Sequence, residues 1–190
     1  MSKHDSIYRY TAAKIAYLGQ QNDSSAGRAM LADLRRGIGK APGELPELWG
    51  IIFDRMPEEL VGKGEPSAAE WAVYTALTLY ALHRQGSTED VQKDGVSIGA
   101  AAAHLIHTDD DTERILKRMN LIATAVSPAD LAYHLRGLIQ LLKGDSVGLD
   151  YALLAKELYM FSFPESANRI KLAWGRDFYR QNQNNKENDT

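Results

Sequence analysis

Apolar side chains recur at helical spacing along most of the chain, and no convincing run alternates apolar and polar residues as a half-buried strand does. The pattern is strongest in residues 67–84, where Trp71, Tyr74, Leu77 and Leu82 leave little polar surface. A helix that is apolar on all sides belongs in a core. The sequence therefore predicts an all-α protein with this helix at its centre.

Capping residues and helix breakers divide the chain into elements. Ser24 or Ser25, Ser67 and the pair Ser127–Pro128 are good helix starts, and Gly37 and Gly144 are good stops. The expected helices span residues 4–21, 25–36, 48–53, 67–84, 97–107, 112–124, 128–143, 149–161 and 164–181. The polar, glycine-containing stretch 85–95 is the expected boundary between two small helical bundles. The predicted division is an N-terminal bundle over 1–88, a C-terminal bundle over 89–182 and a disordered tail over 183–190.

Motifs for chemistry are missing from the sequence. The chain has no cysteine, no Gly-x-Ser-x-Gly, no Walker phosphate loop and no Gly-x-Gly-x-x-Gly, so we expect neither a catalytic residue nor a cofactor. His104 and His107, followed by Asp109, Asp110 and Asp111, have the residue types of a metal site and leave a metal-dependent hydrolase as a remote alternative. The three aspartates also suit the start of a helix, whose dipole favours negative charge. We expect that structural role and no metal.

Charge is unevenly distributed. The net charge is −3, yet residues 1–40 carry seven Lys or Arg against three acids, and residues 41–70 carry two against seven. A polyanion responds to the field within about 8 Å at physiological salt, so net charge does not exclude nucleic acid. The polar start of the chain has no apolar signal core, and no apolar run reaches the ~18 residues of a membrane span. We expect a cytoplasmic protein that does not enter membranes.

Three basic groups have helical spacing, and each is a candidate surface for phosphates. They are Arg28, Arg35 and Arg36; Arg114, Lys117 and Arg118; and Arg169, Lys171, Arg176 and Arg180. Solvated helix faces, or arginines paired with acids between helices, explain the same spacing. Trp49, Trp71 and Trp174, with Phe178, are expected in the core rather than as platforms for bases.

Several segments occur in the order and spacing of a known family. They are residues 99–105, rich in alanine; 117–125, basic and then apolar; 130–142, the most specific match; 149–155; 169–179; and, nearer the start, 28–37 with Pro42 and Gly43. In these segments the chain resembles the CasB family, the small subunit of type I-E CRISPR Cascade surveillance complexes. Met119 stands where the family usually has an aromatic residue.

The resemblance implies a non-catalytic, all-helical subunit that binds nucleic-acid backbone and stabilises an R-loop. The implied partners are the other Cascade subunits, a second copy of the chain, the CRISPR RNA–DNA heteroduplex and the displaced single DNA strand. It favours the three basic groups as contacts and adds His134 and Arg136, within the most specific segment, to the expected binding residues. A helical protein–protein adaptor without nucleic-acid contact is the alternative.

Overall fold

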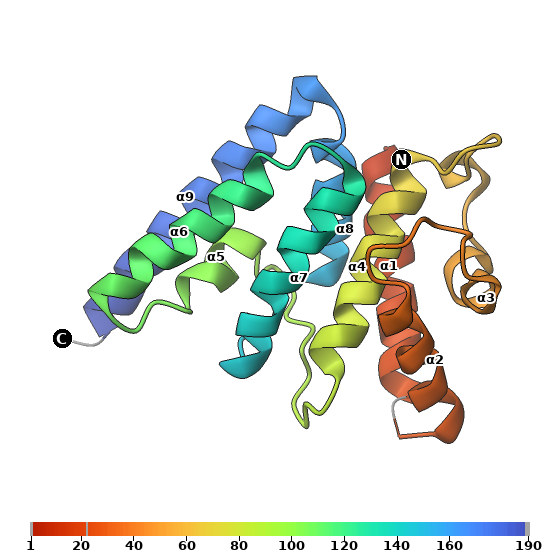
Figure 1. Ribbon diagram of the computed structural model, residues 1–190, viewed down its shortest axis with the longest axis horizontal. Helices are drawn as coiled ribbons and strands as arrows, with labels where there is room; N and C mark the ends of the chain where they lie inside the picture. The colour runs from red at the N-terminus through yellow and green to blue at the C-terminus, as the bar shows by residue number, and fades with distance from the viewer. Residues whose placement is uncertain (1, 22, 189–190) are drawn as a thin grey trace.

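The computed structural model describes residues 2–21 and 23–188, and its regular structure is helical (Figure 1). The helices are α1 (Lys3–Gln21), α2 (Ser25–Arg36), α3 (Trp49–Phe53), α4 (Ala68–Arg84), α5 (Ile98–Ala103), α6 (Asp109–Ala123), α7 (Pro128–Gly144), α8 (Tyr151–Phe161) and α9 (Pro164–Asn188). Two short 3-10 helices, η1 (Pro46–Leu48) and η2 (Glu58–Leu60), flank α3. Over these ranges no strand forms, and the one isolated bridge joins Gln92 to Leu149. The prediction of an all-α fold is confirmed.

Side-chain caps define several helix starts where the sequence predicted them. The Ser24 hydroxyl accepts a hydrogen bond from the backbone N–H of Gly27 at the start of α2. Ser67 and Glu70 form a reciprocal capping box at α4. Ser127 caps α7, whose first residue is a proline. Each such cap stabilises the protein by about 1 kcal/mol, so local sequence chemistry accounts for these boundaries.

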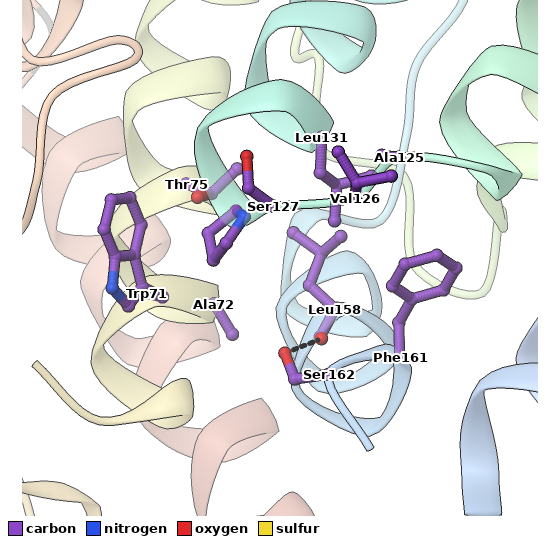
Figure 2. Close-up of a pocket in the computed structure, with 11 residues that line it drawn as sticks. Trp71, Ala72, Thr75, Ala125, Val126, Ser127, Leu131, Leu158, Phe161 and Ser162 are labelled. Carbon is purple, nitrogen blue, oxygen red and sulfur yellow. Dashed lines mark hydrogen bonds between the residues drawn. The ribbon is translucent and has the colours of Figure 1, made fainter. Parts of the chain in front are cut away.

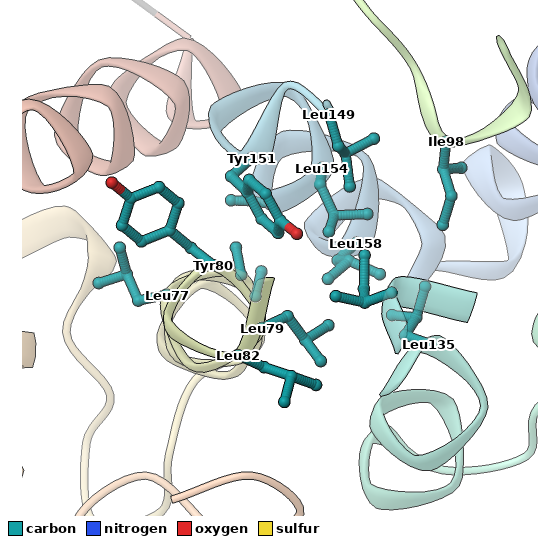
Figure 3. Packing of buried hydrophobic residues seen from close by; sticks show 14 of the residues in the cluster. Leu77, Leu79, Tyr80, Leu82, Ile98, Leu135, Leu149, Tyr151, Leu154 and Leu158 are labelled. Carbon is teal, nitrogen blue, oxygen red and sulfur yellow. The ribbon is translucent and has the colours of Figure 1, made fainter. Parts of the chain in front are cut away.

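Helix α4 lies at the centre of the core, as its composition predicted. Nearly every residue from Ala69 to His83 is buried. The helix packs against α8, α7, α2 and α1. Figure 3 shows Leu79 and Tyr80 of α4 near Tyr151 and Leu158 of α8, and the Tyr80 and Tyr151 rings meet edge-on with centroids 5.5 Å apart. Substituting one of these large side chains by alanine would cost about 2–5 kcal/mol.

The hydrophobic core is continuous across the predicted domain boundary. Helices α1 and α4 both pack on α8, and one buried cluster runs from Ile7 to Phe178. Asp150, the N-cap of α8, also accepts hydrogen bonds from the backbone of Gly95 and the side chain of Gln92, which fixes the connecting segment. The division between residues 88 and 89 stays a prediction.

Two helices near the predicted tail and metal motif have different limits from those expected. Helix α5 ends at Ala103, so His104 to His107 form a turn, and α6 begins at Asp109. Helix α9 continues to Asn188, over residues that the sequence predicted to be disordered. The extension has partners: the Asn185 side chain donates to the carbonyl of Ala103 at 3.3 Å. The rest of the predicted tail, 189–190, lies outside the described residues.

Among the helices that the structure describes, none combines the length and apolar character needed to cross a bilayer.

Candidate nucleic-acid interface

Helices α6 and α7 bring together residues that the sequence placed in separate groups. The two helices pack against each other and are joined by the short loop 124–127. Arg118 of α6 and Arg136 of α7 line a common hollow of about 360 Å³. We call this hollow the α6–α7 groove, and its lining residues are Arg118, Leu121, Tyr133, His134, Arg136, Gly137 and Gln140.

Gly137 leaves room for the Arg118 guanidinium against α7. A Cβ atom at position 137 would lie 3.0 Å from Nη1 of Arg118, closer than most side-chain contacts. Glycine within a helix costs about 1 kcal/mol relative to alanine, and Gly137 lies well inside α7. The close approach of Arg118 is a packing reason for this glycine, and it carries a positive charge from α6 onto α7.

The basic side chains in the groove and beside it on α6 differ in whether an acid neutralises them. Arg114 pairs with Asp111 at 2.6 Å, and His134 lies 3.2 Å from Asp130. Three neighbouring cations have no carboxylate partner within the described part of the chain: Lys117, Arg118 and Arg136. Because no internal anion competes for these three charges, they are available to a phosphate.

An exposed aromatic side chain stands beside these charges. Tyr133 is 71% exposed, and its ring meets that of His134 at 72° with centroids 5.4 Å apart. Leu121 on the facing helix is 45% exposed. The sequence reading did not single out Tyr133, although its spacing of three residues from Arg136 places both on one helical face. The groove therefore combines cations, a polar amide, an aromatic ring and an aliphatic side chain.

The first basic group is engaged within the protein. We call Arg28, Arg35 and Arg36 the α2 arginines. Arg36 contacts Asp33 at 2.7 Å and Glu47 at 2.9 Å, which ties α2 to η1. Arg35 donates to the carbonyl of Ala81 at 3.4 Å, in the last turn of α4, where positive charge is favourable. Arg28 is exposed and donates to a backbone carbonyl of the preceding loop. Their role in nucleic-acid binding stays a prediction.

The basic group on α9 is mixed. Arg180 pairs with Asp177 at 2.6 Å. Lys171 is half-buried, with its Nζ 5.4 Å from the centre of the Phe161 ring. Arg169 and Arg176 are exposed and have no carboxylate partner among the described residues. The structure thus leaves two of these four predicted contacts unpaired, and the whole set stays a prediction.

The predicted metal alternative gains nothing from the geometry. Nε2 of His107 lies 2.6 Å from a carboxylate oxygen of Asp145, and this hydrogen bond raises the pKa of the histidine. The Asp111 carboxylate instead accepts hydrogen bonds from the side chains of Arg114 and Thr108 and from the backbone N–H groups of His107 and Thr108. These contacts, the one with Arg114 above all, lower the pKa of Asp111. No cluster of three potential metal ligands occurs over residues 2–21 and 23–188.

Two buried ionisable groups have structural partners. His83 contacts the Tyr151 hydroxyl at 2.8 Å, and burial lowers its pKa to about 4. Glu157 accepts a hydrogen bond of 2.7 Å from the indole N–H of Trp174. Burial raises the pKa of Glu157 to about 7. Both pairs join helices of the core, so neither group faces a surface ligand.

The comparisons with known proteins agree on one family. Residues 30–179 match the model of the family described as CRISPR-associated protein Cse2. The chain belongs to the Cse2 family. The comparison with curated proteins gives no match.

Solved structures support the membership. The chain is similar to CasB from Thermobifida fusca, with 32% identity, a TM-score of 0.77 and coverage of 91% of this chain and 97% of that one. It shares its fold with CasB from Thermus thermophilus, at 21% identity and a TM-score of 0.67 over 94% of this chain and 99% of that one. A chain of a structure named as a CRISPR RNA-guided surveillance complex matches at 21% identity and a TM-score of 0.72, covering 97% and 99%. The recognition of this family from sequence is confirmed.

The Cse2 match includes the whole α6–α7 groove and leaves Arg28 and Arg180 outside. Thus the basic residues of α6 and α7 that lack a carboxylate partner lie within the span that matches the family. Arg28 and Arg180, each at the end of a predicted basic group, lie outside that span.

A second hollow of this Cse2-family chain has a different character. An apolar pocket of about 220 Å³ lies between α4, the 124–127 loop, the start of α7 and the end of α8. Figure 2 shows the residues that line it. Its lining includes Trp71, Val126 and Phe161 and no charged side chain. A phosphate would find no counter-charge there, so the pocket does not extend the basic groove.

The tryptophans divide between the core and the surface. Trp174 is buried, as predicted, and Trp71 is half-buried at the apolar pocket. Trp49 is 52% exposed, so its prediction as a core residue is wrong. Its indole N–H donates to the carbonyl of Gly43 at 3.0 Å, which ties the side chain to the irregular 37–45 connector instead.

Proposed function

We propose that this chain is the non-catalytic small subunit of a type I-E CRISPR RNA-guided surveillance complex, where it binds nucleic-acid backbone and stabilises the R-loop. The single observation that supports this most is the α6–α7 groove, where Arg118 and Arg136 from different helices meet without a carboxylate partner in the described chain. Arginine guanidinium groups bind phosphates through several N–H donors. Family membership and the likeness to a chain of a surveillance complex supply the setting.

The physical task of such a subunit is independent of sequence. Base pairing with the guide selects the target, and protein charges hold the backbone of the opened strands. The proposed partners are therefore the other Cascade subunits, a second copy of this chain, the RNA–DNA heteroduplex and the displaced strand, within the cytoplasm. No cofactor is required, because no bond is made or broken by this subunit.

An adaptor without nucleic-acid contact is the second candidate. The internal ion pairs of the α2 arginines and the uncharged apolar pocket favour it, because both are features of protein packing. An adaptor would join the complex equally well after the basic groove had been reversed in charge. The two functions therefore differ in the behaviour of one variant.

The deciding experiment uses the reconstituted complex with guide RNA. The variant Lys117→Glu/Arg118→Glu is compared with Arg9→Glu/Lys63→Glu, which reverses two exposed cations outside α6 and α7. Both variants should assemble, and only the first should shorten the lifetime of the R-loop, about equally for all targets, because phosphate contacts do not read sequence. Equal R-loop lifetimes for both variants would favour the adaptor.

A further inference from the structure

We infer that the α6–α7 groove selects single-stranded nucleic acid by stacking one unpaired base on Tyr133, with Arg118 and Arg136 on the flanking phosphates. This inference rests on the proposed function and assigns the groove a strand type. It makes Tyr133, which lies outside the three basic groups, a binding residue in its own right.

The surroundings of Tyr133 leave its ring available. The side chain is 71% exposed, and no hydrogen bond within the described residues holds its hydroxyl. Among the described residues, the Tyr133 ring contacts the ring of His134, edge-on at 72°. An edge-on contact engages at most one face of the phenol ring, so the other face is open to a flat ligand. A large aromatic side chain exposed to this degree leaves apolar ring surface in contact with water, and a stacked base would cover that surface.

The side chains around Tyr133 match the parts of a nucleotide. Tyr133, Arg136 and Gln140 are spaced by three and four residues, so they lie along one face of α7 over roughly 10 Å. The arginines supply charge for phosphates, and Gln140 supplies an amide that donates and accepts hydrogen bonds. Leu121 from α6 adds an aliphatic side chain to the same hollow. A groove that bound phosphates alone would have no use for the exposed ring.

A duplex does not present the open base face that the Tyr133 ring could stack on. In a double helix each base is stacked between its neighbours, whereas the bases of a single strand have open faces. Stacking on an aromatic side chain tolerates any base, because every base has a flat face. The groove should therefore prefer single strands without preferring a sequence, as a site that retains a displaced or looped-out strand requires.

The test measures binding of the purified full-length chain to a labelled oligothymidine strand and to a blunt duplex of equal length at low salt. Tyr133→Ala should weaken single-strand binding about 5- to 150-fold, the loss typical of one stacked base. Tyr133→Phe should bind as the unmodified chain does, because the ring is kept. Neither change should alter the dependence on salt, since no phosphate contact is removed. Duplex binding should be the same for all three proteins.

The outcomes separate this inference from the proposed function. If Tyr133→Ala binds the single strand normally while Lys117→Glu/Arg118→Glu does not, backbone binding stands and stacking is overturned. If Tyr133→Ala weakens single strand and duplex alike, the strand preference is overturned. Failure of the unmodified chain to bind a single strand at low salt overturns the inference as well. Circular dichroism of each variant verifies that the helices are intact.

Discussion

The α2 arginines and the α6–α7 groove look alike in sequence and differ in their surroundings. Both contain basic residues from groups that have helical spacing in the sequence. On α2, Arg36 contacts two carboxylates and Arg35 reaches a backbone carbonyl of α4. In the groove, Arg118 and Arg136 converge from two helices with no acid beside them in the described chain. Helical spacing indicates that charged side chains share a face of a helix. Whether those charges are available to bind a phosphate depends on which acids and carbonyls pack next to them.

The largest expected effect concerns stability, and it should come from neither surface. Arginine stays protonated at any pH at which the protein is studied, so the arginines of the two surfaces do not explain a change in stability between pH 5 and 8. The buried carboxyl of Glu157 explains such a change, because burial raises its pKa from 4.5 in the unfolded chain to about 7 in the folded protein. Its contribution to the free energy of unfolding is present below pH 4.5 and is lost as the pH rises to about 7. The loss is at most about 3 kcal/mol.

Glu157→Gln should remove this loss and keep an acceptor for the Trp174 indole. Urea denaturation at pH 5 and pH 8 should show the variant gaining stability relative to the unmodified chain as the pH rises. His83 titrates in the opposite sense, since its lowered pKa costs stability as the pH falls. Comparing variant and parent cancels that contribution. A difference that is independent of pH would contradict the assignment to Glu157.

A smaller effect distinguishes the two surfaces directly. Arg35→Ala/Arg36→Ala should lower the free energy of unfolding by about 1 kcal/mol, because it removes exposed ion pairs and a contact with α4. It should leave single-strand affinity unchanged. Thermal denaturation and fluorescence anisotropy on the same preparations provide both values. A large loss of affinity with unchanged stability would reverse the roles assigned to α2.

The smallest effect tests how the groove is built. Gly137→Ala should stabilise the protein by up to about 1 kcal/mol, because alanine favours the helix and reduces the freedom of the unfolded chain. The added Cβ would lie 3.0 Å from Nη1 of Arg118 and so displaces the guanidinium. The affinity for a single strand should therefore fall a few-fold. Greater stability together with equal or tighter binding would show that the Arg118 position does not matter.

Local chemistry allowed much of the fold to be predicted. The starts of α2 and α4 follow from Ser24 and Ser67, whose side chains cap the helices by accepting hydrogen bonds from backbone N–H groups three residues later. Trp49 was predicted wrongly because apolar neighbours in sequence suggested a core position, whereas its indole bonds a connector carbonyl. The end of α5 at Ala103 was missed because the next helix begins soon afterwards at Asp109.

The sequence predicted several residues of the candidate site but not how the fold arranges them around one groove. Arg118, His134 and Arg136 were all expected to bind, two of them through the family resemblance. The Arg118 side chain lies against α7 because α6 and α7 pack closely at Gly137, and sequence periodicity does not reveal this packing. Tyr133 was missed because an aromatic residue in an apolar segment resembles a core residue until its exposure is known.

The slope of log affinity against log salt tests the central claim most directly. Lys117→Glu/Arg118→Glu and Arg35→Glu/Arg36→Glu change the charge equally, so they are matched variants on the two surfaces. Each phosphate contact contributes about 0.7 to the slope for a single strand. In the reconstituted complex at several salt concentrations, the first pair should flatten the slope by about 1.4 and the second should leave it unchanged. Equal slopes for both variants and the unmodified complex would contradict the claim that the α6–α7 groove holds the backbone.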